Sequence, residues 1–275
     1  MRFCRYSTEE GSRYGLVENV AGRDTITRNM EGPQLQVSAT GVPECIVLRE
    51  PGEPLAAPLP LDEAKVLIPL PLLSKILCVG KNYAAHVKEF GGEVPSEPLI
   101  FSKPPSSLLA HGGKILRPRI SQRVDYEGEL CVIIGRTCHR LGAEESAKPF
   151  ILGYTCLNDV TARDLQRKDN QWTRAKGFDT FCPLGPVIQT ELDPWVGVRV
   201  QSRVNGELRQ DASTADLIYS LDVVVRHISQ FCTLLPGDVI ATGTPEGVGA
   251  LQAGDVVEVT IEGIGTLRNP VGDED

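Results

Sequence analysis

The central segment of the sequence reads Val124-Asp-Tyr-Glu-Gly-Glu-Leu-Cys-Val-Ile-Ile-Gly135. From Leu130 onward it is apolar and rich in β-branched residues, which predicts a buried strand that ends at Gly135. Because side chains in a strand alternate between two faces, Glu127 and Glu129 are expected to project from the same side. Two such carboxylates at the edge of a core repel each other unless a positive group lies between them. A divalent cation is one candidate for that group, and the alternative is an edge strand whose acids point into water.

Composition and charge narrow the class of protein. The 275 residues are enough for one large domain, or for a small domain beside a catalytic one. Hydrophobic residues make up 41% and charged residues 23%, as in an ordinary soluble globular protein. The formal net charge of −8 argues against a nucleic acid or an anionic membrane as the partner. No run of about 18 apolar residues is present that would predict a membrane span.

The cysteines and the N-terminal residues bear on the compartment. Eight cysteines are scattered without a CxxC pair or a Cys/His cluster, which disfavours a zinc site. The residues after Met1 lack the apolar core of a signal peptide, so the thiols are expected to be reduced and buried. We therefore expect an intracellular, cytoplasmic protein, with a mitochondrial location left open.

Two regions differ in composition. Residues 1–70 are predicted to form a small β-rich domain that includes a hairpin around Gly11. The Pro-rich segment Pro51–Pro71 is predicted to be a linker rather than a regular element. Residues 71–275 are predicted to form the second, catalytic domain.

The catalytic region begins with a short apolar strand, Ile76–Gly80. A short helix is predicted after it, with Asn82 as its N-cap and Gly91 as its stop. His86 and Glu89 are three residues apart on this helix and share a face. A carboxylate next to an imidazole makes a general base, although such a pair also occurs on ordinary protein surfaces.

A third carboxylate is expected close to the first two. Asp159 follows directly after a predicted strand, Ile151–Asn158, at the kind of position where catalytic residues are held rigidly. Arg163 and Gln166 lie four and seven residues further on, at helical spacing. Trp172–Pro186 is predicted to be a loop from its Gly and Pro content, and it contains Lys176 among small and aromatic residues.

These residues suggest oxygen-based metal chemistry. Glu127, Glu129 and Asp159 would supply three carboxylates, a donor set that suits Mg²⁺ or Mn²⁺ and also admits Ca²⁺. The glycine-rich segment Gly243–Gly249 lacks the GK[ST] ending of a phosphate-binding loop, so a nucleotide site is rejected. Its backbone amides and Thr244 are expected to face a carboxylate of the substrate.

Five segments together resemble the fumarylacetoacetate hydrolase family, and the likeness is greatest to its short members. They are Gly80-Lys-Asn-Tyr-Ala-Ala-His-Val-Lys-Glu89, Asp125-Tyr-Glu-Gly-Glu-Leu130, Asn158-Asp-Val-Thr-Ala-Arg-Asp-Leu-Gln166, Lys176-Gly-Phe-Asp-Thr-Phe-Cys-Pro-Leu-Gly-Pro186 and Pro236-Gly-Asp-Val-Ile-Ala-Thr-Gly-Thr-Pro-Glu-Gly-Val-Gly249. The resemblance implies an α+β, mainly β fold with a rolled mixed β-sheet, and a homodimer.

It also implies roles for the site residues. Glu127, Glu129 and Asp159 match the metal ligands of the family. His86 and Glu89 match a dyad on a mobile lid that activates water, and Lys176 matches a lysine that stabilises developing negative charge. The remaining matches are polar substrate contacts: Arg163, Gln166 and Thr244.

The function expected from these residues is divalent-metal-dependent cleavage of a C–C bond in an acylpyruvate or a related 1,3-dicarbonyl acid. The same site would also support decarboxylation of oxaloacetate or isomerisation of a hydroxydienoate. Two alternatives come from other classes: a non-catalytic carboxylate-binding or scaffold protein, and an enzyme recruited to a specialised biosynthetic pathway with an unusual, larger substrate. The expected partner is a small-molecule carboxylate substrate rather than a nucleic acid or a membrane.

Overall fold

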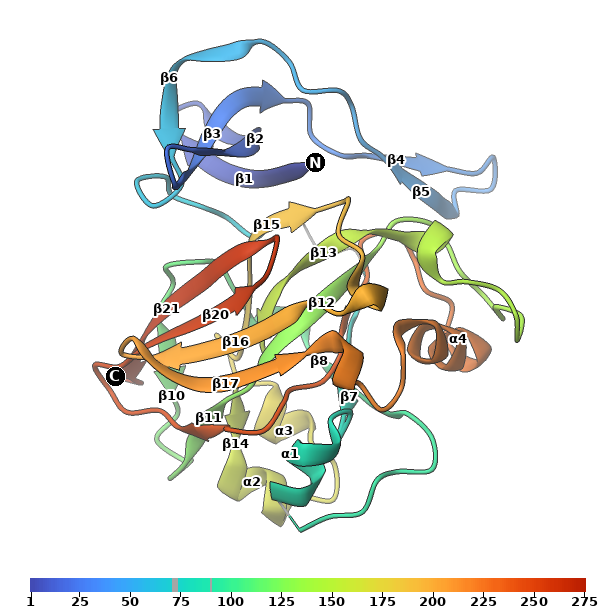
Figure 1. The fold of residues 1–275 in the computed structure, drawn as a ribbon, viewed down its shortest axis with the longest axis vertical. Helices are drawn as coiled ribbons and strands as arrows, with labels where there is room; N and C mark the ends of the chain where they lie inside the picture. The colour runs from blue at the N-terminus through green and yellow to red at the C-terminus, as the bar shows by residue number, and fades with distance from the viewer. Residues whose placement is uncertain (71–73, 90) are drawn as a thin grey trace.

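The computed structural model describes residues 1–70, 74–89 and 91–275 (Figure 1). Its largest sheet runs through the whole molecule and contains parallel and antiparallel pairs. In order along the sheet, its strands are β6 (Pro54–Pro60), β3 (Arg23–Met30), β2 (Gly11–Val20), β1 (Arg2–Thr8), β15 (Cys182–Gln189), β13 (Ile151–Asn158), β12 (Gly128–Ile134), β18 (Val239–Ala241), β7 (Ile76–Gly80) and β8 (Leu99–Lys103), with β9 (Leu108–Leu109) paired to β15.

Smaller sheets complete the fold. The second sheet has the order β10 (Ile115–Arg117), β21 (Gly265–Asp273), β20 (Val256–Ile261), β16 (Arg199–Val204) and β17 (Glu207–Ser213). The short strands β14 (Thr161–Ala162), β11 (Val124–Tyr126) and β19 (Gly249–Ala250) form a third sheet, and β4 (Gln34–Val37) pairs with β5 (Pro43–Val47). The predicted mainly β fold with mixed sheets is confirmed.

Helices are few and short in the described ranges. The α-helices there are α1 (Ala84–Glu89), α2 (Arg163–Lys168), α3 (Thr173–Lys176) and α4 (Leu221–Phe231). The first three lie at the end of the molecule opposite the N-terminal strands (Figure 1). None of the helices in the described ranges is long and apolar enough to cross a bilayer.

The predicted central strand is β12, and all of its residues are buried. Leu130, Val132 and Ile134 belong to a core cluster that also contains residues of α4. Cys131 and Ile133 belong to a second cluster. This alternation is the two-residue period of a strand that is covered on both faces, which is why its sequence is continuously apolar.

The N-terminal hairpin is confirmed, because β1 pairs with β2 around the turn before Gly11. The prediction of a linker over Pro51–Pro71 is wrong for Pro54–Pro60, which is the strand β6; residues 71–73 lie outside the described ranges. Strand β6 has a neighbour on one side only, β3, so the missing N–H groups of its prolines break no ladder on the open side. The N-terminal strands join the large sheet where β1 pairs with β15.

Trp172–Pro186 also differs from its prediction as a loop. It contains α3 and the first part of β15. Strand β15 pairs with β1, β13 and β9, and this tertiary pairing outweighs the local preference of Gly and Pro for loops.

Candidate active site and metal centre

The three predicted carboxylates converge at one end of the pair β12–β13. Glu129 lies on β12, Glu127 precedes that strand, and Asp159 follows β13 directly. The backbone N–H of Asp159 donates to the carbonyl of Glu127 at 2.8 Å, which brings the ends of the two strands together. All three residues are buried, and one carboxylate oxygen from each lies within 4.8 Å of the others.

Two buried lysines contact these acids. The Nζ atom of Lys176 lies 2.7 Å from Oε2 of Glu127 and 2.5 Å from Oδ2 of Asp159. The Nζ atom of Lys103 lies 2.6 Å from Oδ1 of Asp159. Sequence reasoning singled out Lys176 and missed Lys103, although a lysine at the end of an apolar strand and before two prolines is an unusual feature.

Arg163 has its guanidinium turned toward acids of the protein. It donates to Oδ2 of Asp125 at 2.9 Å, to Oε1 of Glu127 at 2.5 Å and to Oε1 of Gln166 at 2.6 Å. Both Arg163 and Gln166 nevertheless line the pocket.

Charge and burial act in opposite directions on the acids. Burial alone would raise the pKa of Glu127, but the charges of Lys176 and Arg163 outweigh it and hold that pKa well below its usual range. Burial and the neighbouring carboxylates of Asp159 and Glu127 raise the pKa of Glu129 well above its usual value. Burial opposes the charge on Lys176, but Asp159 and Glu127 raise its pKa to about 12. Glu129 is therefore the acid for which a further positive charge would be most favourable.

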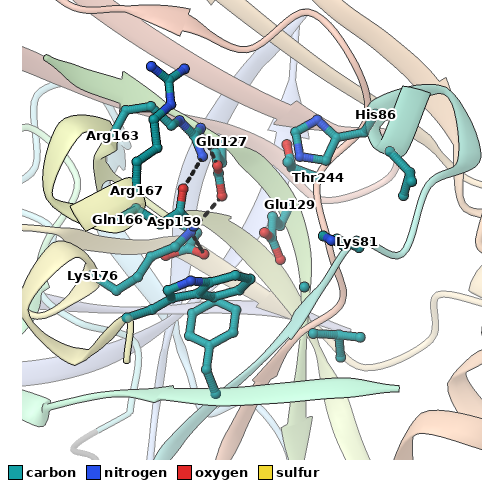
Figure 2. A pocket seen from close by; sticks show the side chains of 15 residues that line it. Lys81, His86, Glu127, Glu129, Asp159, Arg163, Gln166, Arg167, Lys176 and Thr244 are labelled. Carbon is teal, nitrogen blue, oxygen red and sulfur yellow. Dashed lines mark hydrogen bonds and ion pairs between the residues drawn. The ribbon is translucent and has the colours of Figure 1, made fainter. Parts of the chain in front are cut away.

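The His86–Glu89 pair forms on α1. Nδ1 of His86 lies 3.2 Å from Oε2 of Glu89, and the backbone N–H of Gly247 donates to Oε1 of the same carboxylate at 3.2 Å. His86 is buried, with 8% of its surface exposed, whereas Glu89 is exposed, so the pair joins a buried imidazole to a carboxylate at the surface. Figure 2 shows His86, Thr244 and Lys81 on one side of the three carboxylates, and Lys176 with the α2 residues on the other.

The predicted N-cap, Asn82, has another role. Its side chain donates to the carbonyls of Tyr219 and Thr242 and accepts from the N–H of Tyr219. The helix prediction over 82–91 is otherwise supported over Ala84–Glu89, while residue 90 lies outside the described ranges. Asn82 therefore fixes the base of α1 to two distant segments rather than capping the helix.

The segment from Gly243 also differs from its prediction. The backbone N–H of Gly243 donates to Oε2 of Glu129 at 2.7 Å, so this amide faces an acid of the protein. Gly243 has φ +104°, and a Cβ atom here would lie 2.7 Å from Cβ of Asn82, so only glycine fits. Thr244 lines the pocket, while its hydroxyl donates to the carbonyl of Gly128 at 3.0 Å.

Together these residues line a pocket of about 220 Å³. Every predicted site residue lines it except Glu89, which contacts His86 but does not line the pocket itself. Its other lining residues were not predicted, and they fall into an apolar group and a cationic group: Val79, Gly80, Val87, Phe101 and Trp172, and Lys81 and Arg167.

Comparison with known proteins places this site in a family. The family model of the fumarylacetoacetate (FAA) hydrolase C-terminal domain matches residues 75–272. An oxaloacetate tautomerase from Bacillus subtilis is 42% identical over 225 residues, which cover 77% of this chain and 74% of that protein. The crystal structure of 5-carboxymethyl-2-hydroxymuconate delta-isomerase from Mycobacterium smegmatis superposes with a TM-score of 0.82, 42% identity and full coverage of both chains.

A third similar protein has been solved with a metal ion. It is a fumarylpyruvate hydrolase from Pseudomonas aeruginosa, in complex with Mn²⁺ and pyruvate. Its TM-score is 0.69 at 33% identity, and the match covers 75% of this chain and 91% of that chain. The match of the family model over most of the chain, together with these relatives, shows that the protein belongs to the fumarylacetoacetate hydrolase family.

Proposed function

We propose that the protein is a divalent-metal-dependent enzyme that converts a 2-oxo acid through its enolate, and that its reaction is the tautomerisation of a 2-oxo acid such as oxaloacetate. The observation that carries this proposal is the group Glu127, Glu129 and Asp159, which lies across the pocket from His86, the buried member of the His86–Glu89 pair. The names of the B. subtilis and M. smegmatis relatives support the same class of reaction.

Glu127, Glu129 and Asp159 are the proposed metal ligands. Three buried carboxylates with converging oxygens fit Mg²⁺ or Mn²⁺, and Ca²⁺ accepts the same donors. The bound ion would supply Lewis acidity, polarising the 2-oxo group and lowering the energy of the enolate.

The protein's own groups would move the proton. His86, oriented by Glu89, would remove a proton from C3 of the keto form; the electron pair of that C–H bond would form the C2–C3 double bond, and the π pair of the carbonyl would move to the 2-oxo oxygen. Lys176 would donate a hydrogen bond to the developing oxyanion. Return of the proton held by His86 to that oxygen, through solvent, would complete the enol, and the reverse steps would restore the ketone. We propose Arg163, Gln166 and Thr244 as polar contacts that orient the substrate.

Hydrolysis of an acylpyruvate is the second candidate, because His86, buried and paired with Glu89, is also suited to activating water. Water would lose a proton to His86 and add to the carbonyl remote from the carboxylate. The C–C bond would then break, with its electron pair passing to the enolate of pyruvate, and protonation would release pyruvate and a carboxylic acid.

One set of assays distinguishes these reactions. The purified protein would be incubated with enol-oxaloacetate, acetylpyruvate or fumarylacetoacetate, in Mg²⁺, Mn²⁺ or EDTA. We expect metal-dependent loss of the enol absorbance of oxaloacetate without a change in mass. Pyruvate and acetate from acetylpyruvate would favour the hydrolase, and CO₂ from oxaloacetate would favour a decarboxylase. Turnover that persists after exhaustive EDTA treatment would contradict the proposed metal dependence.

We also propose that the protein forms a homodimer, as the family resemblance implies. Light scattering coupled to size exclusion should give twice the mass of one chain. A mass equal to that of one chain would refute the dimer without affecting the proposed reaction.

A further inference from the structure

The cationic side chains that line the pocket differ in whether they already contact acids of the protein. Lys176 is bonded to Glu127 and Asp159, and the guanidinium of Arg163 is bonded to Asp125, Glu127 and Gln166. Arg167 lines the same pocket, its side chain is exposed, and it makes no hydrogen bond or ion pair with the described part of the chain. Its charge is therefore available to a ligand.

Helix α2 places Arg167 on the substrate side. Arg163 and Arg167 are four residues apart, so they are neighbours on one face of the helix. Figure 2 shows both on the side of the pocket that carries Gln166 and Lys176. The guanidinium of Arg163 contacts Glu127, one of the proposed metal ligands. On this side of the pocket, Arg167 is therefore the next cation away from those ligands.

The charge of the pocket favours a substrate with two negative charges. Three carboxylates and four cationic side chains line it, an excess of one positive charge before any divalent ion is counted. One carboxylate of the substrate would lie at the metal end, beside Lys176. A second carboxylate would otherwise meet walls such as Val87, Phe101 and Trp172, which cannot compensate its lost hydration.

We infer that Arg167 is a specificity-determining residue that binds the second carboxylate of a 2-oxo dicarboxylic acid; this inference rests on the proposed function. The planar guanidinium can donate two parallel hydrogen bonds to a carboxylate. Water at the mouth of the pocket cannot replace this charged, bidentate contact. Lys81 also lines the pocket without a hydrogen bond or ion pair to the described residues, but it lies on the opposite side of the pocket. Its Nζ atom lies along the segment after α1, 3.4 Å from where a Cβ atom of Gly92 would be.

The kinetic test compares oxaloacetate with its 4-methyl ester, which keeps the 2-oxo acid end and loses the second charge. Arg167→Gln should raise KM for oxaloacetate about 10-fold or more, the usual scale for a lost charged hydrogen bond, with little change in kcat. Turnover of the ester should be unchanged. Arg167→Lys should restore part of the loss, and the control Lys168→Gln, on the same helix but outside the pocket, should behave as wild type.

A binding test separates this inference from the proposed reaction. Calorimetric titration of the Mg²⁺-loaded protein would use malate, a four-carbon dicarboxylate, and oxalate, which fills the metal end alone. Arg167→Gln should weaken malate and leave oxalate unchanged. Equal effects on both ligands, or a selective loss in Lys81→Gln in place of Arg167→Gln, would overturn the role of Arg167. A wild-type protein that turns over neither substrate would refute the proposed reaction, while the titrations would still decide on Arg167.

Discussion

Lys103 and Lys176 contact opposite oxygens of a single buried carboxylate, that of Asp159. The Nζ–O distances are 2.6 Å to Oδ1 and 2.5 Å to Oδ2. Lys103 also donates to the carbonyl of Val160 and does not line the pocket, whereas Lys176 does. The two lysines are therefore suited to different tasks: Lys103 fixes Asp159 from the core side, and Lys176 presents positive charge to the pocket.

Replacing Lys103 tests the first task. Lys103→Met leaves Asp159 buried with one of its two cations removed, and breaking a buried ion pair costs about 3–5 kcal/mol. We expect the free energy of unfolding in urea, without added metal, to fall by that amount. The exposed control Lys168→Met should change it by less than about 0.5 kcal/mol. A Lys103→Met protein as stable as wild type would show that this contact does not hold the site.

Removing a proposed metal ligand should weaken ion binding. Glu127→Gln and Asp159→Asn each remove a negative charge from the group, so calorimetry should show weaker binding of Mg²⁺ and Mn²⁺, and turnover should fall by orders of magnitude. Glu97→Gln, a change at an exposed acid that does not line the pocket, is the matched control. Unchanged ion affinity in both ligand variants would refute this assignment.

The roles of His86 and Lys176 can be separated by reaction type. His86→Ala should reduce hydrolysis of an acylpyruvate by about 10²-fold or more, the scale of a lost general base. Any decarboxylation of oxaloacetate should fall much less, because that reaction needs no activated water. Lys176→Ala should damage both reactions, since both pass through the same anion. If His86→Ala left hydrolysis intact, the base would have to be sought elsewhere.

The segment around α1 should respond to ligand. The helix has six residues, too few to be stable by itself, and glycines follow it at positions 91 and 92. We expect amide hydrogen exchange over residues 83–89 to slow when oxalate and Mg²⁺ are added, because closure over the ligand would restrict this segment. Exchange at α4 serves as the internal reference. Equal exchange in the two states would argue against a mobile lid.

The cysteines should differ in reactivity. Cys45 and Cys232 are partly exposed, whereas the other six are buried. Burial raises the pKa of Cys4 and of Cys156 to about 12, so at pH 8 their thiolate fraction is negligible. Iodoacetamide should therefore label Cys45 and Cys232 in the native protein and all eight cysteines after unfolding, as read by peptide mass spectrometry. Labelling of Cys4 or Cys156 at native pH would indicate local opening of the core.

The sequence predicted the carboxylate cluster well, because it depends on local rules. The two-residue spacing predicted that Glu127 and Glu129 lie together, and they do, although Glu127 falls in the break between β11 and β12. A strand end next to them explains Asp159. Lys103 was missed since its contact with Asp159 joins residues 56 positions apart, and no local pattern contains that pairing. For Arg163, helical spacing correctly predicted that it shares a face with Gln166. The spacing from Asp159 is not helical, because the strand β14 precedes the helix, and spacing does not specify which acid the guanidinium contacts.

The errors in the fold have the same origin. Pro54–Pro60 and Cys182–Gln189 carry residues that locally favour loops, and both become strands because a partner strand lies alongside. Asn82 is a good N-cap by residue type, yet its amide makes stronger connections to Tyr219 and Thr242, which are distant in sequence.

Asn82 also limits how far His86, the proposed general base, can move. Both the nitrogen and the oxygen of its buried side-chain amide are hydrogen-bonded, so the chain is fixed at a point four residues before His86. Four residues span at most roughly 14 Å even when fully extended. The distance over which the imidazole can move is thus limited by the length of this segment, and under the proposed function this limit would set an upper size for the acids that fit beneath the imidazole. Inserting residues between Asn82 and His86 is the change by which the enzyme could be adapted to bulkier acids.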